Sequence, residues 1–346
     1  PEHFFNPTEE DLLPLDALKN IDRAYELVKK HLNGDIRILW DVDTDGITSG
    51  AIITKYLRDM GVTPQAFIND GKAHGLLGQD IERFAGTDLL IIVDSLDADC
   101  SQYKKIKESG TDIIVLDHHY VSPEQPYNEY VTLVSSQVDY GNPALSGAGV
   151  VWKFCKYIDD MELTDYASKY MDLAASGLVA DMMDMTNMEN RYIVNEGLKQ
   201  INCLTVKKII GSFEFNSTAI SFSISPLINA AMRTNNSQLA LNAFMAEENK
   251  EEIKTVFYIG MYTGQRLKDC VLMQWHNVDL EHRRIWVKQF KTGKEVSIPV
   301  FNCIKAAINN EFEALDKHEY LEATLAMNFY QFQDADEDEK MRCLSY

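Results

Sequence analysis

Three short apolar segments, each followed directly by acidic or histidine side chains, constrain the fold of this chain more than any other feature. They are residues 36–40 (IRILW), 89–93 (LLIIV) and 113–116 (IIVL). Each has the length of a buried strand, and residues 47–60 have the apolar spacing of an amphipathic helix. Residues 65–68 predict a further strand. Strands that alternate with helices in this way predict an α/β fold with a doubly wound parallel sheet.

Side chains that can bind metals gather where the predicted strands end. Residues 41–45 (DVDTD) follow the first strand, Asp94 ends the second, and residues 117–119 (DHH) end the third. The carboxyl ends of parallel strands share one edge of a sheet, which is where open α/β folds bind ligands. Asp181 interrupts an apolar helical segment, where a carboxylate needs a partner, and Asp184 falls close to the same helical face.

Carboxylates at this density repel one another unless cations neutralise them. Oxygen ligands together with an imidazole suit Mn²⁺ or Mg²⁺ better than a zinc–thiolate site does. Two ions that share a carboxylate form the arrangement used for in-line phosphoryl displacement, so we expect two ions. The alternative is that these aspartates only cap helices and turns. The candidate set is Asp43, Asp45, Asp94, His118 and Asp181, with Asp41, Asp117, His119 and Asp184 as neighbours.

A glycine-containing segment, residues 146–150 (SGAGV), precedes a helix predicted over residues 151–159. Gly147 and Gly149 allow two interpretations. They can form a tight turn that lets the helix pack closely, or a backbone cradle for phosphate at the start of the helix. The sequence leaves both open.

Composition narrows the class of protein. The 346 residues are 45% hydrophobic and 25% charged, which is typical of a globular protein of two or three domains. The formal net charge of −20 argues against a protein that coats nucleic acid with a basic surface, although bound divalent ions reverse the sign locally. No segment has the length of a membrane span, and residues 1–5 do not resemble a secretory signal. The six cysteines lack a CxxC pair and are expected to be reduced thiols of a cytoplasmic protein, in a bacterium or a phage-infected cell.

The character of the chain changes along its second half. We predict a helical connection and then a smaller, partial α+β C-terminal domain with strands at residues 285–287 and 296–299. The acidic segment 334–339 is typical of a solvated tail. The predicted divisions are an α/β domain at 1–190, a helical connector at 191–220, a substrate-binding segment at 221–255, a separate fragment at 256–302, and a helical and acidic tail at 303–346.

Four motifs, in their order and spacing, are similar to those of the DHH phosphoesterase superfamily. They are WDVDTDGITS, IIVDS, VLDHH and GLVADMMDM. Within that superfamily the chain looks most like the RecJ-type single-strand exonucleases, in a compact, phage-like form. ALSGAGVVWKF, MENRYIVNEGL and SPLINAAMRTNNSQLAL extend the resemblance over roughly residues 4–250.

The resemblance implies roles for individual residues. Asp94 would bridge two ions, and His119 would serve as an acid/base group or only orient the ligand His118. Arg233 would grip a substrate phosphate through its guanidinium group, although Met232 stands where the family usually has glycine. His74 aligns loosely with a family loop and is taken as a surface histidine. The implied metal ligands are Asp43, Asp45, Asp94, His118 and Asp181, and the candidate substrate contacts are Arg233, Asn229, Ser49, Gly147 and Gly149.

Residues 256–300 resemble part of a tyrosine recombinase catalytic domain instead of the family's usual continuation. By that analogy Arg266 would bind phosphate and Lys291 would be a general acid. The remaining chain has no HxxR motif, and His318 and Tyr320 do not reproduce the nucleophile's context. Strand exchange is therefore not expected. The segment is interpreted as a fusion, an added DNA-contacting module or an ordinary hairpin surface.

These inferences predict a phosphodiesterase that uses Mn²⁺ or Mg²⁺ and trims single-stranded DNA from a 5′ end to mononucleotides. Polarity and the preference for DNA rest only on the resemblance. One alternative is a DHH enzyme that acts on short oligonucleotides or cyclic dinucleotides. Another is a protein that binds metal and DNA without cleaving it. The sequence does not indicate an oligomeric state.

Overall fold

The computed structural model describes residues 2–69, 74–211, 213–233 and 237–246, and in the C-terminal part residues 278–279, 281–282, 284–288 and 295–299. Contacts between residues divide the chain into two units, residues 1–248 and 249–346. The finer five-part division stays a prediction.

The first unit is built on a five-stranded parallel sheet with the order β2-β1-β3-β4-β5, which confirms the predicted fold class. The central strand, β3, is buried along its whole length, which explains its uninterrupted apolar sequence. From β1 the chain crosses to β2 on one side, whereas β4 and β5 lie on the other side of β3. The order therefore reverses between β1 and β3, and ligands bind at such a point in open α/β sheets. The strands are β1 (Ile36–Trp40), β2 (Gln65–Ile68), β3 (Leu89–Val93), β4 (Asp112–Asp117) and β5 (Thr132–Ser135).

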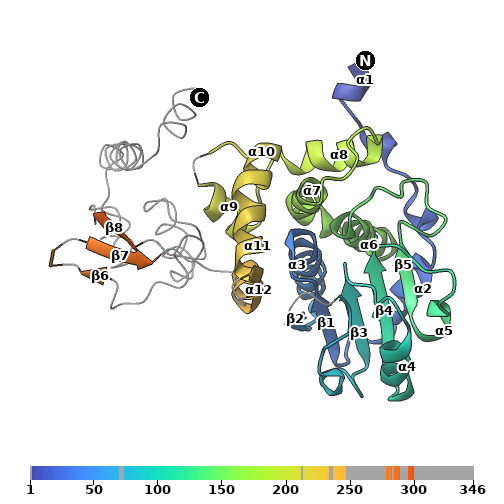
Figure 1. Ribbon diagram of the computed structural model, residues 1–346. Helices are drawn as coiled ribbons and strands as arrows, with labels where there is room; N and C mark the ends of the chain where they lie inside the picture. Colours follow the sequence, from blue (N-terminus) through green and yellow to red (C-terminus); the bar gives the residue numbers. More distant parts are fainter. Residues whose placement is uncertain are drawn as a thin grey trace. The chain divides into compact units, whose positions relative to one another are not determined.

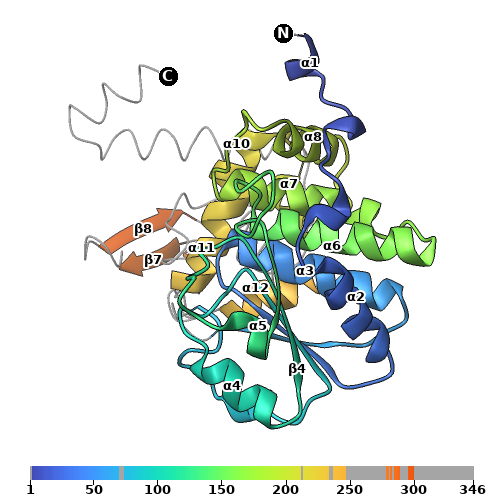
Figure 2. The same cartoon turned by 90° about the vertical axis from the view of Figure 1, so that its right-hand side faces the viewer.

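Helices cover both faces of the sheet. On one face α3 contacts β1 and β3, and α6 contacts β4; α3, α6 and α7 lie next to one another in both views (Figure 1, Figure 2). On the other face Tyr103 and Ile106 of α4 join Leu90, Ile92 and Val115 of the strands in one apolar cluster. The helices are α1 (Glu2–Phe5), α2 (Ile21–Lys30), α3 (Thr44–Asp59), α4 (Ser101–Glu108), α5 (Tyr127–Tyr130), α6 (Gly147–Glu162), α7 (Met171–Ala180), α8 (Met188–Gly197), α9 (Leu204–Ile210), α10 (Ser217–Ala219), α11 (Ser225–Arg233) and α12 (Ser237–Phe244), with a π-helical segment, Ile220–Ile224, before α11.

Two helices begin earlier than their apolar patterns predict. The helix expected over residues 47–60 starts at Thr44, because the Asp43 carboxylate accepts a hydrogen bond from Gly46 N and caps it. The helix expected over residues 151–159 starts at Gly147, where the Ser146 hydroxyl accepts a hydrogen bond from Gly149 N. Polar caps and glycines thus belong to these helices although they lack apolar spacing. As a result, Asp45 and Gly147 both lie in first turns.

In the second unit the structure describes three antiparallel strands, β6 (Val278–Asp279), β7 (Arg284–Lys288) and β8 (Glu295–Pro299). The predicted strands at 285–287 and 296–299 are therefore confirmed. Arg266, Lys291, His318 and Tyr320 lie outside the described residues. Among the helices of the described residues, none is both long enough and apolar enough to span a lipid bilayer.

Candidate metal centre

The segment that leaves β1 supplies three carboxylates to the switch point of the sheet. Asp41 follows the strand and is buried, and its Oδ1 accepts hydrogen bonds from Asn69 Nδ2 (2.8 Å) and Ser95 Oγ (3.1 Å). Asp43 is the N-cap of α3, and Asp45 is buried in the first turn of that helix. The N-terminal end of α3 carries partial positive charge, which favours acidic groups at this position.

Asp94, directly after β3, is the most constrained acid of the site. Its backbone has a φ of 54°, in the left-handed region that non-glycine residues rarely adopt. Its side chain is buried, and Oδ1 has no hydrogen-bond partner among the described residues. A Cβ on Gly147 would lie 2.5 Å from this oxygen, so only glycine allows α6 to start so close to it. A buried carboxylate oxygen without a hydrogen-bond partner is costly, and a cation would compensate it.

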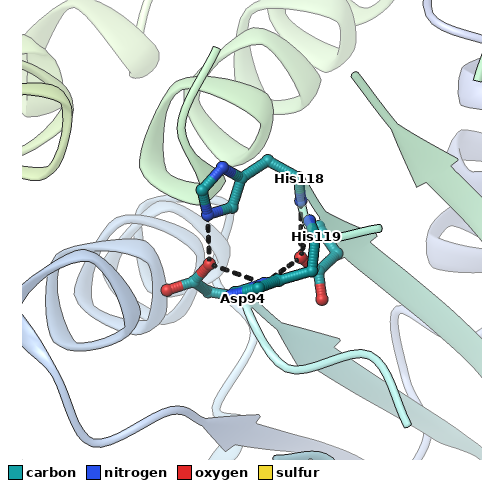
Figure 3. Close-up of side chains that lie close together, drawn as sticks. Asp94, His118 and His119 are labelled. Carbon is teal, nitrogen blue, oxygen red and sulfur yellow. Dashed lines mark hydrogen bonds and ion pairs between the residues drawn. The ribbon is translucent and has the colours of Figure 1, made fainter. Parts of the chain in front are cut away.

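The two histidines after β4 turn toward Asp94 (Figure 3). His118 Nε2 lies 3.2 Å from Asp94 Oδ1, 3.6 Å from Asp181 Oδ2 and 3.7 Å from Asp45 Oδ2. His119 Nδ1 is 2.7 Å from Asp117 Oδ1 and 3.7 Å from Asp94 Oδ1. Asp117 also accepts hydrogen bonds from the backbone N–H groups of both histidines, so it fixes the orientation of the pair.

Asp181 and Asp184 occupy different environments in the structure. α7 ends at Ala180, so Asp181 is its C-cap and its carboxylate reaches His118. Asp184 lies on the exposed loop beyond and accepts hydrogen bonds from Thr186 N (2.8 Å) and Thr186 Oγ1. The expectation that Asp184 neighbours the site on the same helical face is therefore wrong, because the helix does not continue to it.

The glycine segment contacts a carboxylate. Gly147 N and Ala148 N donate to the two oxygens of Asp45, at 2.7 and 3.1 Å. Gly149 N donates to the hydroxyl of Ser146, which is the N-cap of α6. All three N–H groups are therefore already engaged, and those of Gly147 and Ala148 position Asp45. Ser49, a predicted substrate contact, is fully buried in α3, and its hydroxyl has no hydrogen-bond partner in the described part of the chain.

Burial and mutual repulsion set the electrostatics of the site. Burial raises the pKa of Asp43, Asp45 and Asp181, and it raises that of Asp94 well above its usual value with a further contribution from Asp45. For Asp117, the hydrogen bond with the His119 ring and the charges of both histidines outweigh burial and lower the pKa. The same hydrogen bond raises the pKa of His119 to about 9. Most of the acids are thus held where a negative charge is unfavourable without a cation.

His74 lies at the surface, as expected, but it also borders the site, which the sequence did not indicate. Its Nδ1 is 3.4 Å from Asp41 Oδ2, and its ring centroid is 5.1 Å from that of His119. The hydrogen bond with Asp41 raises its pKa. The His74 side chain is about half exposed, so it borders the site on the solvent side.

The loop that follows His74 is fixed by hydrogen bonds from its backbone. Gly75 N donates to Ser95 Oγ (2.7 Å), and Leu76 N and Leu77 N donate to Asp97 Oδ1 (3.0 and 3.1 Å). Sequence reasoning missed Asn69, Ser95 and Asp97, although Asn69 is a polar residue directly after a strand, the same signal that identified Asp94. His74 had no comparable signal, because only the fold brings residues 74–77 to the segment that follows β3.

The predicted substrate segment, α11, starts beside the carboxylates. The Ser225 hydroxyl accepts hydrogen bonds from Thr44 Oγ1 (3.2 Å) and from Asn229 Nδ2 (3.3 Å). Asn229 Oδ1 is buried and has no partner among the described residues. Arg233 is the last residue of α11, and the structure describes only its backbone.

The acids and histidines form three overlapping groups whose ligand atoms lie within 4.8 Å of one another: Asp41, Asp43 and Asp94; Asp45, His118 and Asp181; and Asp94, Asp117, His118 and His119. Oxygen atoms dominate, with one or two imidazole nitrogens in two of the groups. This donor set fits Mn²⁺ or Mg²⁺. Asp94 and His118 each belong to two groups, which places them between two candidate ion positions.

Comparison with known protein families gives two matches. The DHH family, N-terminal domain, matches residues 35–178. The phage integrase family matches residues 231–330, which include the segment predicted to resemble a tyrosine recombinase. Both predicted resemblances are therefore confirmed.

Individual relatives agree with the first match. The chain is 34% identical over 271 residues to a putative SPbeta prophage-derived single-strand DNA-specific exonuclease, YorK, of Bacillus subtilis; this covers 73% of the chain and 46% of that protein. It is 27% identical over 281 residues to the single-stranded-DNA-specific exonuclease RecJ of Bacillus subtilis, covering 77% of the chain and 35% of the relative. A crystal structure of RecJ in complex with Mn²⁺ from Thermus thermophilus matches with a TM-score of 0.61 and 26% identity, over 68% of the chain and 36% of the other. The chain thus spans less than half the length of these relatives.

Proposed function

A DHH-family N-terminal domain occupies residues 35–178 of the chain, and from that premise we propose that the protein is a metal-dependent exonuclease acting on single-stranded DNA. Its similarity to single-strand DNA-specific exonucleases supports the substrate, and the structures of RecJ with Mn²⁺ and with Mg²⁺ support the cofactor. Release of mononucleotides from a 5′ end, in the cytoplasm of a bacterium or a phage-infected cell, is part of the same proposal.

The observation that carries the proposal is the buried Oδ1 of Asp94, which has no hydrogen-bond partner among the described residues and lies beside the imidazoles of His118 and His119. The backbone of Asp94 is strained, and the neighbouring Asp41 and Asp43 add negative charge. A protein gains no stability from such an arrangement unless cations occupy it. Backbone strain and buried charges that destabilise the folded protein are typical of an active site.

Two ions would be held by Asp43, Asp45, Asp94, His118 and Asp181, with Asp94 between them. When bound, they supply positive charge that stabilises the attacking and leaving oxygens of a displacement at phosphorus and favours ionised water as nucleophile. Asp117 and the N–H groups of Gly147 and Ala148 hold these side chains in place. This rigid support reduces the reorganisation needed during the reaction.

His119 acts beside the ions in this proposal. Its Nδ1 is engaged with Asp117, so Nε2 is the ring atom left to donate a proton or hydrogen bond to a phosphate oxygen. Arg233 would bind another phosphate of the strand, since a guanidinium forms two parallel hydrogen bonds with phosphate oxygens. Asn229, whose Oδ1 is unpaired among the described residues, would contact the strand next to Thr44.

The test is degradation of a 5′-labelled single strand with Mn²⁺, beside the duplex form and a two-nucleotide substrate. The variant is Asp94→Asn. Asp139→Asn is the matched control, because Asp139 also has a left-handed backbone (φ 53°) but is exposed and paired with Lys19. We expect labelled mononucleotide from the single strand with the wild type and Asp139→Asn, and at least about a hundredfold less with Asp94→Asn.

Other outcomes have separate meanings. Cleavage of the two-nucleotide substrate alone would replace the exonuclease by an enzyme for short oligonucleotides. If the 5′ label stays on the strand while the strand becomes shorter, degradation proceeds from the 3′ end and the proposed polarity is wrong. Metal and DNA binding without cleavage of any substrate would overturn the enzymatic proposal.

A further inference from the structure

Three large apolar side chains are exposed to solvent on segments that carry residues of the metal centre. Leu77 is 55% exposed, Tyr120 78% and Met182 87%. Tyr120 directly follows His119, and Met182 directly follows Asp181. Single exposed apolar residues are common, whereas several around one site indicate a binding surface. We call these three residues the apolar rim.

Contacts between residues of the metal centre bring the three segments of the apolar rim together. The ring centroids of His74 and His119 are 5.1 Å apart, so the loop of residues 74–77 reaches the segment after β4. His118 Nε2 lies 3.6 Å from Asp181 Oδ2, so the end of α7 reaches the same segment. Consecutive Cα atoms are about 3.8 Å apart, which places the residue after each of these side chains at the border of the site. The apolar rim therefore borders the metal centre shown in Figure 3.

The backbone of Leu77 is fixed by buried groups. Leu77 N donates a hydrogen bond to Oδ1 of the buried Asp97 (3.1 Å), and Leu76 N donates to the same carboxylate. A Cβ on Gly75, whose φ is 63°, would lie 2.4 Å from Asp97 Oδ1, so this turn requires glycine. The loop is thus held by buried hydrogen bonds and yet exposes an apolar side chain. A surface fixed in this way loses little conformational entropy when a ligand binds.

Met182 has an unfavourable backbone conformation. Its φ is 52°, and it follows Asp181, the C-cap of α7. Met183 N donates to Leu178 O (3.1 Å) across this helix end, where glycine is the usual residue because it adopts positive φ without strain. A methionine at this position costs stability and exposes apolar surface to water. Backbone strain at a site is typical of a residue that contacts a ligand, and a thioether adapts to ligands of different shape.

We propose that the apolar rim binds the bases of a single DNA strand whose phosphate lies at the metal centre. The inference rests on the proposed function and adds how the strand is recognised. The Tyr120 ring stacks on any base, because every base has a π face, and Met182 and Leu77 offer further apolar contacts. A single strand exposes the faces of its bases, whereas a duplex keeps them stacked inside the helix. The apolar rim therefore favours single strands over duplex without selecting a sequence.

The test measures equilibrium binding of two fluorescently labelled strands to the full chain: a thymidine oligonucleotide, and an abasic strand with the same number of phosphates. Ca²⁺ replaces Mn²⁺, and gel electrophoresis verifies that the strands stay intact. The variants are Met182→Gly, Tyr120→Ala and Tyr120→Phe. Leu163→Gly is the matched control, because Leu163 is also an exposed residue with a positive φ (56°) at a helix end. It follows α6, about 24 Å along that helix from Gly147.

We expect Tyr120→Ala to bind the thymidine strand about tenfold more weakly than the wild type does, and Met182→Gly about fivefold more weakly. Tyr120→Phe keeps the ring, so it should match the wild type within about twofold, as should Leu163→Gly. The abasic strand should bind equally to the wild type and all variants, because it offers no base. Thermal unfolding should show no loss of stability for Met182→Gly, since glycine adopts the same φ without strain.

Three results would overturn the inference. The first is a wild type without saturable binding of the thymidine strand, or equal binding by Met182→Gly, Tyr120→Ala and Leu163→Gly. The second is an equal loss of affinity for the abasic strand. The third is a changed oligomeric state of the variants in light scattering, which would identify the apolar rim as an interface between copies of the chain. Hydrolysis with Mn²⁺ is measured separately: a wild type that binds the strand through its bases without cleaving it would contradict the proposed function and support the apolar rim.

Discussion

At the scale of single residues, Asp94 concentrates the unfavourable energy of the site. Its left-handed backbone and its buried oxygen without a hydrogen-bond partner are each a cost to the metal-free protein. An asparagine keeps the shape of the side chain and tolerates the same backbone region, but it carries no charge. Function and stability should therefore respond to this substitution in opposite directions.

Asp94→Asn is expected to raise the free energy of unfolding of the metal-free protein at pH 8 by about 1–2 kcal/mol, because it removes a buried charge. It should also reduce the stabilisation by Mn²⁺, which for the wild type is about 2.7 kcal/mol at a hundred times the dissociation constant. Urea unfolding with and without Mn²⁺ measures both effects. Equal Mn²⁺ stabilisation of the variant and the wild type would remove Asp94 from the ligand set.

Gly147→Ala is expected to lower the rate of DNA hydrolysis at least about a hundredfold, because the new Cβ would displace Asp94 and misplace the ligands. Gly110→Ala is the control. Gly110 has a φ of 95°, and a Cβ added there would meet no heavy atom within 4 Å, so alanine costs about 1 kcal/mol of stability through the backbone alone. The rates of both variants are measured at saturating Mn²⁺. A low rate with Gly147→Ala alone would indicate displaced ligands, and an equally low rate with Gly110→Ala would indicate general destabilisation.

At the scale of elements, the backbone of residues 75–77 is held by Ser95 and Asp97 of the segment after β3. Burial raises the pKa of Asp97 from 3.8 to about 6. A carboxyl group with a raised pKa binds its proton more tightly in the folded state, so its contribution to stability falls as the pH rises from about 4 to 6. The full effect corresponds to about 3 kcal/mol.

Asp97→Asn should abolish this contribution. The difference in free energy of unfolding between wild type and variant is expected to change by about 2–3 kcal/mol between pH 4 and 7, with the wild type losing more stability. Urea unfolding at several pH values measures it. Parallel pH curves for the two proteins would contradict the assignment.

A buried ion pair ties the N-terminal segment to α6 and α8. Lys153 Nζ contacts Glu189 Oε1 at 2.5 Å and donates to Leu13 O, and Tyr140 Oη donates to Glu189. Glu189→Gln leaves the lysine charge uncompensated and should cost about 3–5 kcal/mol, whereas Lys153→Met/Glu189→Gln should recover most of this loss. Urea unfolding of both variants decides the point, and a double variant no more stable than Glu189→Gln would contradict it.

The sequence predicted those parts of the fold and site that depend on local pattern. Apolar runs predicted β1, β3 and β4, and the acids and histidines at their ends pointed to Asp43, Asp94 and His118, which the structure brings close together. The pattern could not identify β5, which is only four residues long and contains two hydroxyl side chains. His74 depends on the path of a loop, and Asp184 on the residue at which α7 ends; neither follows from apolar spacing.

At the scale of the whole molecule, every described candidate ligand belongs to the unit of residues 1–248. A chain that ends at residue 248 is therefore expected to fold cooperatively and to keep the Mn²⁺ stabilisation of the full chain within about 1 kcal/mol. Thermal unfolding of both chains with and without Mn²⁺ measures this. Loss of the Mn²⁺ response in the shorter chain would show that the second unit contributes to the metal centre.

The candidate ligands come from four segments that are distant in sequence: the ends of β1, β3 and β4 and the end of α7. Bound ions would therefore act as cross-links between loops as well as reagents. Their arrival should slow the exchange of backbone amide hydrogens at residues 41–48, 94–97, 117–119 and 178–183 together, and leave the opposite edge of the sheet unchanged. In a cell short of manganese the same loops would open more often, which would expose the metal-free protein to proteolysis before the metal-loaded one.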